Sequence, residues 1–194
     1  MPEITADMTL DCKGLACPMP IVKTKKAIDQ LDAGQVIEVQ ATDQGSIADI
    51  QGWAKNTGHH YLGTVEECEV LKHYIRKANP NEVNEEKKYP LIISSDELQK
   101  KLSENEKVTV IDVRETAEFA FNRIAGAVSI PLGELEHRIS KLNPDDEIVV
   151  VCRTGNRSDM ACQLLAGKGF KHVKNLESGM SGWNGSTINY DSQN

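Results

Sequence analysis

The sequence predicts two compact units joined by a polar linker. Residues 1–78 are expected to form an α+β two-layer sandwich with the order β-α-β-α-β-β, and residues 90–194 an α/β doubly wound parallel sheet. The first observation is the length, since 194 residues suit two domains of ordinary size. The second is the stretch 79–89, which is polar, nearly free of apolar side chains and interrupted by Pro80. The third is the alternation of β-branched runs with helical patterns after Pro90, which is typical of a parallel sheet.

The first half contains alternating signals of strands and helices. Pro18 and Pro20 mark a helix start, because proline is tolerated in a first turn, and Gly34 is the residue expected just after its end. Ser46 is the expected N-cap of a second helix, which Gly58 ends. Strands are expected at residues 9–11, 36–41, 60–66 and 69–76.

The second half alternates strands with helices throughout. A doubly wound sheet binds its ligand at the carboxyl ends of the parallel strands, and Asp112 and Cys152 both fall at such ends. Strands are expected at residues 91–93, 108–113, 127–130, 148–151 and 172–175. Helices are expected after a Ser95 cap and over residues 115–121, 132–142 and 158–167.

Cys152 ends the apolar run 148–151 and is followed by a loop that holds a glycine and two arginines. A loop between a strand end and a helix start turns its backbone amides toward the preceding sulfur, and such a nest binds anions. These surroundings stabilise a thiolate, so Cys152 is expected to be a nucleophile that takes the outer sulfur of thiosulfate and releases sulfite. The alternative is a buried cysteine that simply ends a strand. The residues expected to bind the donor and the resulting persulfide are Arg153, Thr154, Gly155, Asn156, Arg157 and Ser158.

Cys17 stands directly before Pro18, at the start of the first predicted helix. Unpaired amides and the positive end of the helix dipole are expected to face its sulfur, and Lys13 and Lys23 are expected to add positive charge. Such surroundings lower the pKa of a thiol from about 8.5 to roughly 7 or below, which predicts a reactive thiolate. The alternative is a buried structural cysteine at a helix start.

The residues around Cys17 also form part of a longer sequence pattern that extends through the first half. The core is Cys17-Pro18-Met19-Pro20, and its order with later pieces makes the pattern specific. The matching residues are 10–20, Lys23, Ala41-Thr42-Asp43, Gly45-Ser46, Trp53 and Thr57-Gly58-His59. With these residues the first half resembles the TusA (SirA-like) sulfur-carrier family. The resemblance implies that Cys17 carries a persulfide sulfur and passes it on by contact between proteins, and it implies no metal site.

The second half carries three groups of residues in a comparable order. They are Asp112-Val113-Arg114-Glu115 with Glu118-Phe119, Ile124, Gly126-Ala127 and Ile130-Pro131, then residues 152–158, then Gly179-Met180 with Trp183. This half resembles a single rhodanese (sulfurtransferase) domain over almost its whole length. The resemblance implies Cys152 as the persulfide-forming nucleophile, residues 153–157 as substrate-binding, and Asp112 and Arg114 as supporting residues.

Two departures from the rhodanese pattern bear on substrate preference. Asn122-Arg123 stand where the family usually has Gly-His, and Glu177-Ser178 stand where a glycine is usual. The loop spacing also separates sulfur transfer from oxyanion chemistry. Cysteine phosphatases and arsenate reductases use Cys-x5-Arg, whereas Cys152 and Arg157 stand in the tighter Cys-x4-Arg spacing. A phosphatase or arsenate reductase is therefore the less favoured enzyme.

The remaining cysteines and a histidine pair carry weaker signals. Cys12 could form a resolving disulfide with Cys17, but spacing alone establishes no such geometry. Cys162 lies on an apolar helical face and is expected in the core, whereas Cys68 lies near a polar turn as an exposed thiol. The adjacent histidines His59 and His60 have no nearby cysteine or carboxylate in the sequence that would complete a metal site.

The net charge, the apolar content and the number of cysteines limit the class of protein to which this chain can belong. A formal net charge of −7 argues against nucleic acid as a partner. Residues 1–7 lack a cationic and an apolar segment, so no signal peptide is expected, and no apolar run suits a membrane span. Five cysteines at irregular spacing do not resemble a secreted disulfide framework. A cytoplasmic protein with reduced thiols and no cofactor is expected.

These observations predict a rhodanese-type sulfurtransferase and persulfide relay. Cys152 would take sulfane sulfur from thiosulfate or a persulfide and exchange it with Cys17 and with thiol or protein acceptors. Cysteine desulfurase and other sulfur-relay proteins are the expected partners. The alternative is an adaptor or persulfide-sensing module that docks such a partner without chemistry at Cys17.

Overall fold

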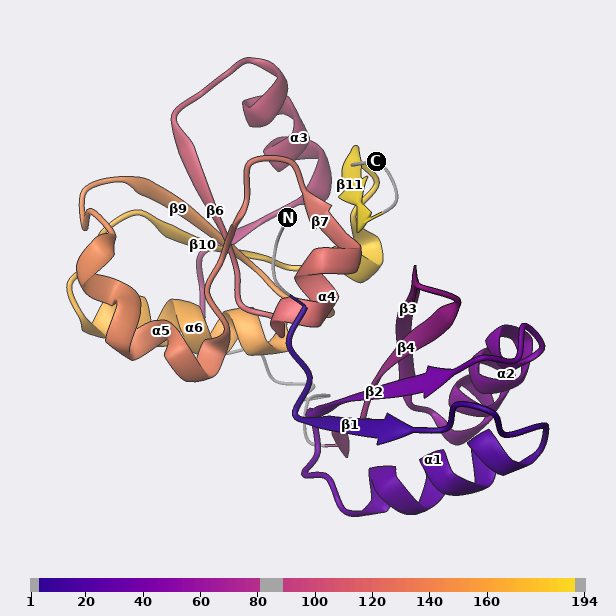
Figure 1. Cartoon of the computed structure of the whole chain (residues 1–194). Coiled ribbons are helices and arrows are strands. Elements are labelled where there is room, and N and C mark those ends of the chain that lie inside the picture. Colours follow the sequence, from indigo (N-terminus) through magenta and orange to yellow (C-terminus); the bar gives the residue numbers. More distant parts are fainter. Residues whose placement is uncertain (1–3, 81–88, 191–194) are drawn as a thin grey trace. The chain divides into compact units, whose positions relative to one another are not determined.

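The computed structural model describes residues 4–80 and 89–190, which form two compact units (Figure 1). Most of the expected linker, residues 81–88, lies outside the described residues. Ala78 belongs to the first unit, where its amide donates to His59 Nδ1 over 3.1 Å. Tyr89 belongs to the second unit, although the sequence places it in the linker: its amide donates to Asp159 Oδ1 over 2.9 Å.

The first unit is a four-stranded sheet covered by two helices, as predicted. The strands run in the order β1-β2-β4-β3; β1 and β2 are parallel, and the other two pairs are antiparallel. The strands are β1 (Met8–Asp11), β2 (Val36–Ala41), β3 (His60–Glu67) and β4 (Val70–Arg76). The helices are α1 (Met19–Asp29) and α2 (Ser46–Thr57), and one apolar core joins them to the sheet.

Two helix-end predictions in this unit are wrong. Helix α1 ends at Asp29, and Gly34 instead lies in the turn before β2 with a φ of +92°. The N-cap of α2 is Gly45 rather than Ser46, because the Ser46 hydroxyl is hydrogen-bonded to a buried histidine. Gly58 ends α2 as predicted, in the left-handed conformation that glycine favours.

That buried histidine, His73 on β4, anchors the start of α2. Its Nε2 atom lies 2.9 Å from Ser46 Oγ, and its Nδ1 atom lies 3.0 Å from both Tyr61 Oη and Thr64 Oγ1. Burial lowers the pKa of His73 to about 4, so the ring is neutral at pH 7. A neutral ring with both nitrogens hydrogen-bonded ties the first turn of α2 to the sheet.

The second unit is a doubly wound sheet of five parallel strands in the order β5-β10-β9-β6-β8. The strands are β5 (Ile92–Ile93), β6 (Val108–Asp112), β8 (Val128–Ser129), β9 (Glu147–Val151) and β10 (Val173–Leu176). The helices are α3 (Ser95–Ser103), α4 (Thr116–Phe121), α5 (Leu132–Arg138) and α6 (Asn156–Gly167). The predicted fold class of both units is confirmed.

Strand β9 shows why the sheet is covered on both faces. Ile148 and Val150 belong to one apolar core with α5 and α6, whereas Val149 and Val151 belong to a second core with α3. Side chains of a strand alternate between the faces, so a continuous apolar run needs a core on each side.

Several boundaries in this unit differ from the prediction. Ser94 rather than Ser95 caps α3, and it forms a capping box with Glu97. Helix α6 begins at Asn156, two residues before the predicted start. A short 3₁₀ turn, Ile139–Lys141, ends the predicted helix 132–142.

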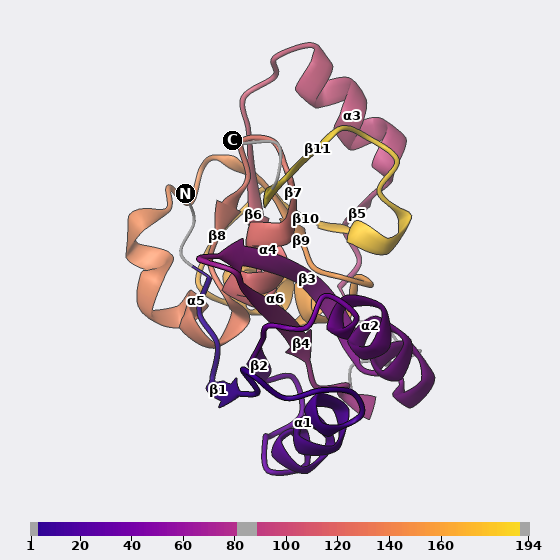
Figure 2. The same ribbon diagram turned by 45° about the vertical axis from the view of Figure 1, so that its right-hand side comes forward.

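The sequence patterns missed one small sheet. Strands β7 (Asn122–Ile124) and β11 (Thr187–Asn189) pair antiparallel and lie side by side in Figure 2. Three residues are too few to show a period, so their pairing depends on tertiary contacts. Within the described residues, no helix is long and apolar enough to cross a membrane.

Candidate functional site

Cys152 directly follows β9, the middle strand of the five-stranded sheet, at the carboxyl end of that strand. Its side chain is 1% exposed, and two donors reach its sulfur. The Gly155 amide donates over 3.1 Å, and Ser158 Oγ lies 3.3 Å away. Donors aimed at a sulfur stabilise its anionic form, whether thiolate or persulfide.

Gly155 allows the chain to turn from β9 into α6 within this short loop. It is the N-cap of α6 and has a φ of +89°, a conformation that glycine favours. Around it, Arg153, Thr154 and Asn156 are half-buried, and the Asn156 amide group lies 3.4 Å from Thr154 Oγ1. Of the predicted loop residues, the structure therefore places the Gly155 amide and Ser158 Oγ at the sulfur.

Asn175, on β10, completes the support of the loop and was missed by the sequence patterns. Its Oδ1 atom accepts from Ser158 Oγ over 2.6 Å, and its Nδ2 atom donates to the Gly155 carbonyl over 3.0 Å. A hydroxyl carries one proton, so Ser158 can donate to Asn175 or to the Cys152 sulfur, but not to both at once. Asn175 is fully buried, but it follows Lys174 in a short mixed strand, so the local sequence carried no signal for this role.

Arg157 uses its guanidinium differently from the prediction. The group forms a two-pronged ion pair with Glu118 of α4, over 2.9 Å and 3.0 Å, and both side chains are buried. It therefore ties α6 to α4 rather than presenting a free fork to an oxyanion. Arg157 belongs to the site through its place in the loop, and Glu118 is the partner that residue spacing did not reveal.

Asp112, the last residue of β6, and Arg114 form a second buried pair. Arg114 Nη2 donates to Asp112 Oδ2 over 2.7 Å and to the Asn122 carbonyl over 2.6 Å. Next to them, the Val113 amide donates to the Val151 carbonyl over 2.9 Å. This pair orders the segment that leads from β6 to α4, and it supports the cysteine loop from one side.

The segment after β10 closes the loop from the other side. The Met180 amide donates to the Cys152 carbonyl over 2.7 Å, and the Ser181 amide donates to the Arg153 carbonyl over 2.9 Å. Gly179 has a φ of +57°, and a Cβ atom there would lie 2.6 Å from the Cys152 and Arg153 carbonyl oxygens. Glycine is therefore required where this segment crosses the loop backbone.

Cys17 lies in different surroundings. It is exposed, and the start of α1 offers few free donors. The Met19 amide already donates to the Ala16 carbonyl over 3.0 Å, and Pro20 has no N–H. Lys13 is engaged by Asp11 and Gln40, over 3.1 Å and 2.7 Å.

The predicted lowering of the Cys17 pKa is wrong. A hydrogen bond to Asp49, partial desolvation and the negative charges of Asp49 and Asp43 raise the pKa of this thiol. These carboxylates belong to α2 and to the loop before it, far from Cys17 in the sequence. The motif around the cysteine therefore gave no sign of them.

Comparisons with known protein families match the two units of the chain separately. A family model described as "Sulfurtransferase TusA" matches residues 8–77, and one described as "Rhodanese-like domain" matches residues 94–186. The "Putative sulfur carrier protein YrkF" of Bacillus subtilis (strain 168) is 47% identical over 182 residues, covering 94% of this chain and 98% of that protein. The chain belongs to this family, which joins a TusA domain to a rhodanese domain.

Relatives that match one part of the chain agree with this result. The "Sulfur carrier protein TusA" of Allochromatium vinosum is 40% identical over 72 residues, which are 37% of this chain and 95% of that protein. A protein named "Sulfurtransferase" from the same organism is 35% identical over 91 residues, 47% of this chain and 85% of that protein. The solution structure of a rhodanese-like domain from Anabaena sp. has a TM-score of 0.50 at 26% identity, over 54% of this chain and 84% of that chain. The chain is therefore a sulfur-transfer protein.

The other cysteines of the two domains are free thiols in contrasting places. Cys12 lies in the core of the TusA domain and Cys162 in the core of the rhodanese domain, both 0% exposed. Burial raises the pKa of each thiol. Cys68 is exposed, as predicted. Cys12 forms no disulfide with Cys17.

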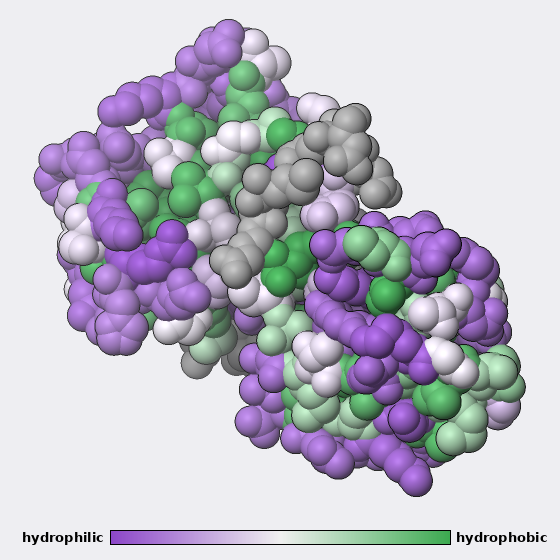
Figure 3. Space-filling view, viewed as in Figure 1, coloured by the Kyte–Doolittle hydropathy of each residue, from purple (hydrophilic) through white to green (hydrophobic). Residues whose placement is uncertain are grey.

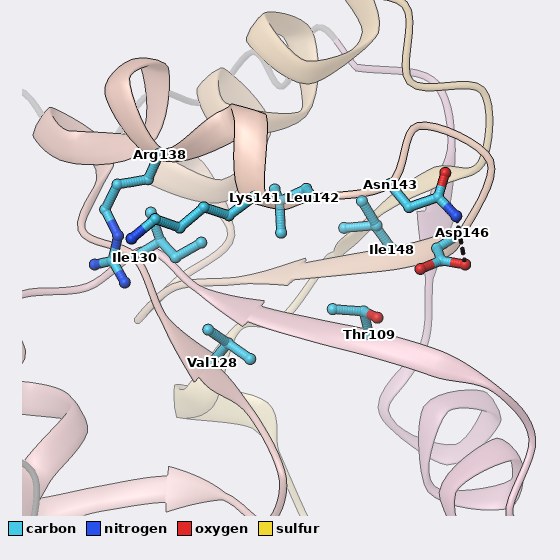
Figure 4. Close-up of a pocket in the computed structure, with 9 residues that line it drawn as sticks. All are labelled: Thr109, Val128, Ile130, Arg138, Lys141, Leu142, Asn143, Asp146 and Ile148. Carbon is cyan, nitrogen blue, oxygen red and sulfur yellow. Dashed lines mark hydrogen bonds between the residues drawn. The ribbon is translucent and has the colours of Figure 1, made fainter.

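A cavity of about 260 Å³ in the rhodanese domain lies apart from this loop (Figure 4). It lies beside β6, β8 and β9 and includes Thr109 and Ile148, near the starts of their strands. Arg138 and Lys141 flank it, and Val128 and Ile130 supply apolar surface. No residue of the loop 152–158 lines it, so the sulfur site does not extend into this cavity.

Proposed function

We propose that this chain is a rhodanese-type sulfurtransferase and persulfide relay. Cys152 takes sulfane sulfur from thiosulfate or a persulfide, and Cys17 exchanges that sulfur with Cys152 and with other acceptors. The observation that carries the proposal is the Gly155 amide, which donates to the buried Cys152 sulfur over 3.1 Å, with Ser158 Oγ 3.3 Å from the same sulfur. Nothing in this arrangement calls for a cofactor.

The first step is attack by the Cys152 thiolate on the outer sulfur of thiosulfate. A bond forms between Sγ and that sulfur, the sulfur–sulfur bond of thiosulfate breaks, and sulfite leaves with the electron pair. The product is a persulfide anion on Cys152. The Gly155 amide then stabilises negative charge that has moved by one bond length, which is preorganised electrostatic stabilisation.

The surrounding residues divide into two roles in this proposal. Arg153, Thr154 and Asn156, half-buried around the loop, contact the donor. Arg157 holds the loop in place through Glu118, and Asp112 with Arg114 supports the neighbouring segment. With a persulfide as donor, a thiolate leaves in place of sulfite.

The second step is thiol–persulfide exchange with Cys17. Cys17 loses its proton to water, and its sulfur attacks the outer sulfur of the Cys152 persulfide. A new bond forms to Cys17, the bond to Cys152 breaks, and Cys152 leaves as a thiolate, so no external oxidant or reductant is needed. A tether within one chain raises the effective concentration of one cysteine near the other.

Exposure of Cys17 suits exchange with other proteins. Met19 and Val22, just after it, are 45% and 41% exposed, so apolar side chains adjoin the thiol. On the face drawn in Figure 3, hydrophilic residues are interspersed with hydrophobic ones. A cysteine desulfurase, another sulfur-relay protein or a small thiol is a suitable donor or acceptor at Cys17.

Persulfide mapping by mass spectrometry tests the proposal. After thiosulfate treatment of the full chain, one added sulfur is expected on Cys152 first and on Cys17 later. In Cys152→Ala, labelling of Cys17 by thiosulfate should disappear, and in Cys17→Ser the label should remain on Cys152. Cys68→Ser, which removes an exposed thiol outside the site, is the control and should label normally.

Two results would overturn parts of this assignment. Unchanged labelling of Cys17 in Cys152→Ala would exclude transfer from Cys152 to Cys17. Sulfur that reaches Cys152 but never Cys17 would leave the TusA domain as an adaptor that docks a partner.

A further inference from the structure

The Cys17 thiol has an acidic side that the proposed relay does not use. Cys17, Asp43 and Asp49 line one narrow crevice between the starts of α1 and α2, together with Pro20, Ser46 and Ile50. Asp49 lines the crevice with the thiol and raises its pKa through a hydrogen bond. An ionised carboxylate only accepts hydrogen bonds, so this contact requires the proton to stay on sulfur.

At the start of α1, few N–H donors or positive charges offset the negative charge of these carboxylates. The Met19 amide donates to the Ala16 carbonyl, and neither Pro18 nor Pro20 has an N–H. Lys13 is paired with Asp11, and the charge of Lys23 acts on Asp11 and on Cys12.

Within residues 4–80, the charged groups that act on the Cys17 sulfur are therefore Asp49 and Asp43. His73, which is hydrogen-bonded to Ser46 of this crevice, is buried and neutral, so it adds no positive charge.

Both carboxylates are held in place by the domain. Ile50, next to Asp49, is 0% exposed, and Ser46, one turn earlier on α2, is hydrogen-bonded to the buried His73. Asp43 accepts from the Gly45 amide over 3.2 Å, and its carbonyl accepts from the Ser46 amide over 3.0 Å. The first turn of α2 and the loop before it therefore hold both carboxylates beside Cys17.

We propose that Asp49 is a positioning residue that holds Cys17 as a neutral, weakly nucleophilic thiol, with Asp43 reinforcing the effect. The thiolate, rather than the thiol, is the nucleophile, so an exposed cysteine held in this way reacts slowly with small electrophiles. The inference rests on the proposed role of Cys17 in sulfur exchange. It adds that Cys17 gains full reactivity only when the influence of these carboxylates is removed.

The pH dependence of alkylation tests this role. In a chain carrying Cys68→Ser and Cys152→Ser, Cys17 is the exposed thiol, because Cys12 and Cys162 are fully buried. The rate of reaction with iodoacetamide is measured from about pH 6 to about pH 10, with and without Asp49→Asn or Asp49→Ala. Both variants should lower the apparent pKa of the reaction and raise the rate at pH 7 by about three- to tenfold, since one pKa unit is about tenfold in thiolate fraction.

Asp49→Ala guards against one ambiguity of the asparagine variant. An asparagine amide can itself donate to a thiolate, whereas alanine removes the carboxylate and adds no donor. A fall in the apparent pKa in both variants therefore assigns the effect to the carboxylate. Asp43→Asn should shift the profile in the same direction by less, because Asp43 acts through charge alone.

Asp32→Asn is the matched control. It makes the same change of charge beyond the far end of α1, a helix of 11 residues that is about 16 Å long. Its profile should equal that of the parent chain. Circular dichroism establishes that each variant is folded.

An unchanged or raised apparent pKa in both Asp49 variants, with the fold intact, would overturn the inference. Alkylation requires no sulfur donor, so this outcome is distinguishable from failure of the relay. A relay that fails would leave Cys17 without sulfur in persulfide mapping while the alkylation profiles still differ.

Discussion

The two candidate sulfur-carrying residues have opposite electrostatic surroundings. Cys152 is buried and accepts a hydrogen bond from the Gly155 amide, whereas Cys17 is exposed beside Asp49 and Asp43. The first environment offers a backbone donor to a buried sulfur, whereas the second raises the pKa of an exposed thiol. In the proposed relay, this contrast makes Cys152 the site that captures sulfur readily and Cys17 the site that requires a docked donor or acceptor.

At the residue scale, the pair between Arg157 and Glu118 allows a stability prediction. Both side chains are nearly inaccessible, at 9% and 3% exposed, so Glu118→Gln removes the close charge partner of a buried guanidinium and leaves the longer contact to Glu115 at 3.9 Å. Breaking a buried pair in this way costs about 3–5 kcal/mol. Urea unfolding of the full chain should show this loss in the transition of the rhodanese domain.

Glu134→Gln is the control for that prediction. Glu134 pairs with Arg138 one turn away on the surface, where both side chains are well exposed. Surface pairs of this kind contribute little, so the change should stay within about 0.5 kcal/mol. Equal effects of the two substitutions would show that the Glu118 pair contributes no more than a solvated one.

At the scale of elements, the cysteine loop is set by the β9–α6 turn together with the segment after β10. Gly155 supplies the turn, and the amides of Met180 and Ser181 hold the carbonyls of Cys152 and Arg153. The loop shape therefore depends on a segment that follows it by more than twenty residues of chain. A change in that segment should disturb the sulfur site without touching it chemically.

Gly179→Ala tests this dependence. The glycine conformation alone costs other residues about 1–3 kcal/mol, and the added Cβ would lie 2.6 Å from the loop backbone. Displacing the loop by ~1 Å should lower thiosulfate sulfurtransferase activity by about a hundredfold. Steady-state assays with thiosulfate and cyanide, together with thermal unfolding, measure both effects.

The helical glycine Gly133 is the matched control. A Cβ atom at this position of α5 meets nothing within 4 Å, and alanine favours a helix by up to about 1 kcal/mol over glycine. Gly133→Ala should therefore keep full activity and unfold at the same or a higher temperature. Full activity in Gly179→Ala as well would refute the proposed dependence of the loop on its closing segment.

At the scale of the whole molecule, each described unit has an apolar core of its own. The TusA domain is built around one cluster and the rhodanese domain around two, one on each face of its sheet. Domains with separate cores can fold separately. We therefore expect each unit to fold without the other.

Division of the chain tests that expectation. Fragments 1–84 and 85–194, which keep Tyr89 with the rhodanese domain, should each show a cooperative unfolding transition by circular dichroism. Transfer of sulfur from Cys152 to Cys17 should become dependent on fragment concentration, because the tether no longer supplies effective concentration. A fragment that is unfolded alone, or a transfer rate independent of concentration, would contradict this view.

The sequence by itself determined the two units, the order of their main elements and the positions of the two candidate sulfur-carrying cysteines. These features depend on short-range signals, such as the apolar run before Cys152, the glycine and arginines after it, and Pro18 and Pro20 beside Cys17. Errors at this level were small shifts of helix ends and one missed sheet of two short strands. Ser46, for example, has an N-cap side chain, but its hydroxyl is bound by a histidine from β4.

Only the tertiary structure decided what surrounds each sulfur. Arg157 could be placed in the loop from spacing, but its guanidinium points at Glu118, which is 39 residues earlier. Cys17 could be placed at a helix start, but the carboxylate beside it comes from a second helix. A pKa depends on charges, donors and burial in three dimensions, and residues from distant parts of the chain supply all three. Local pattern therefore located the thiols, and packing decided their chemistry.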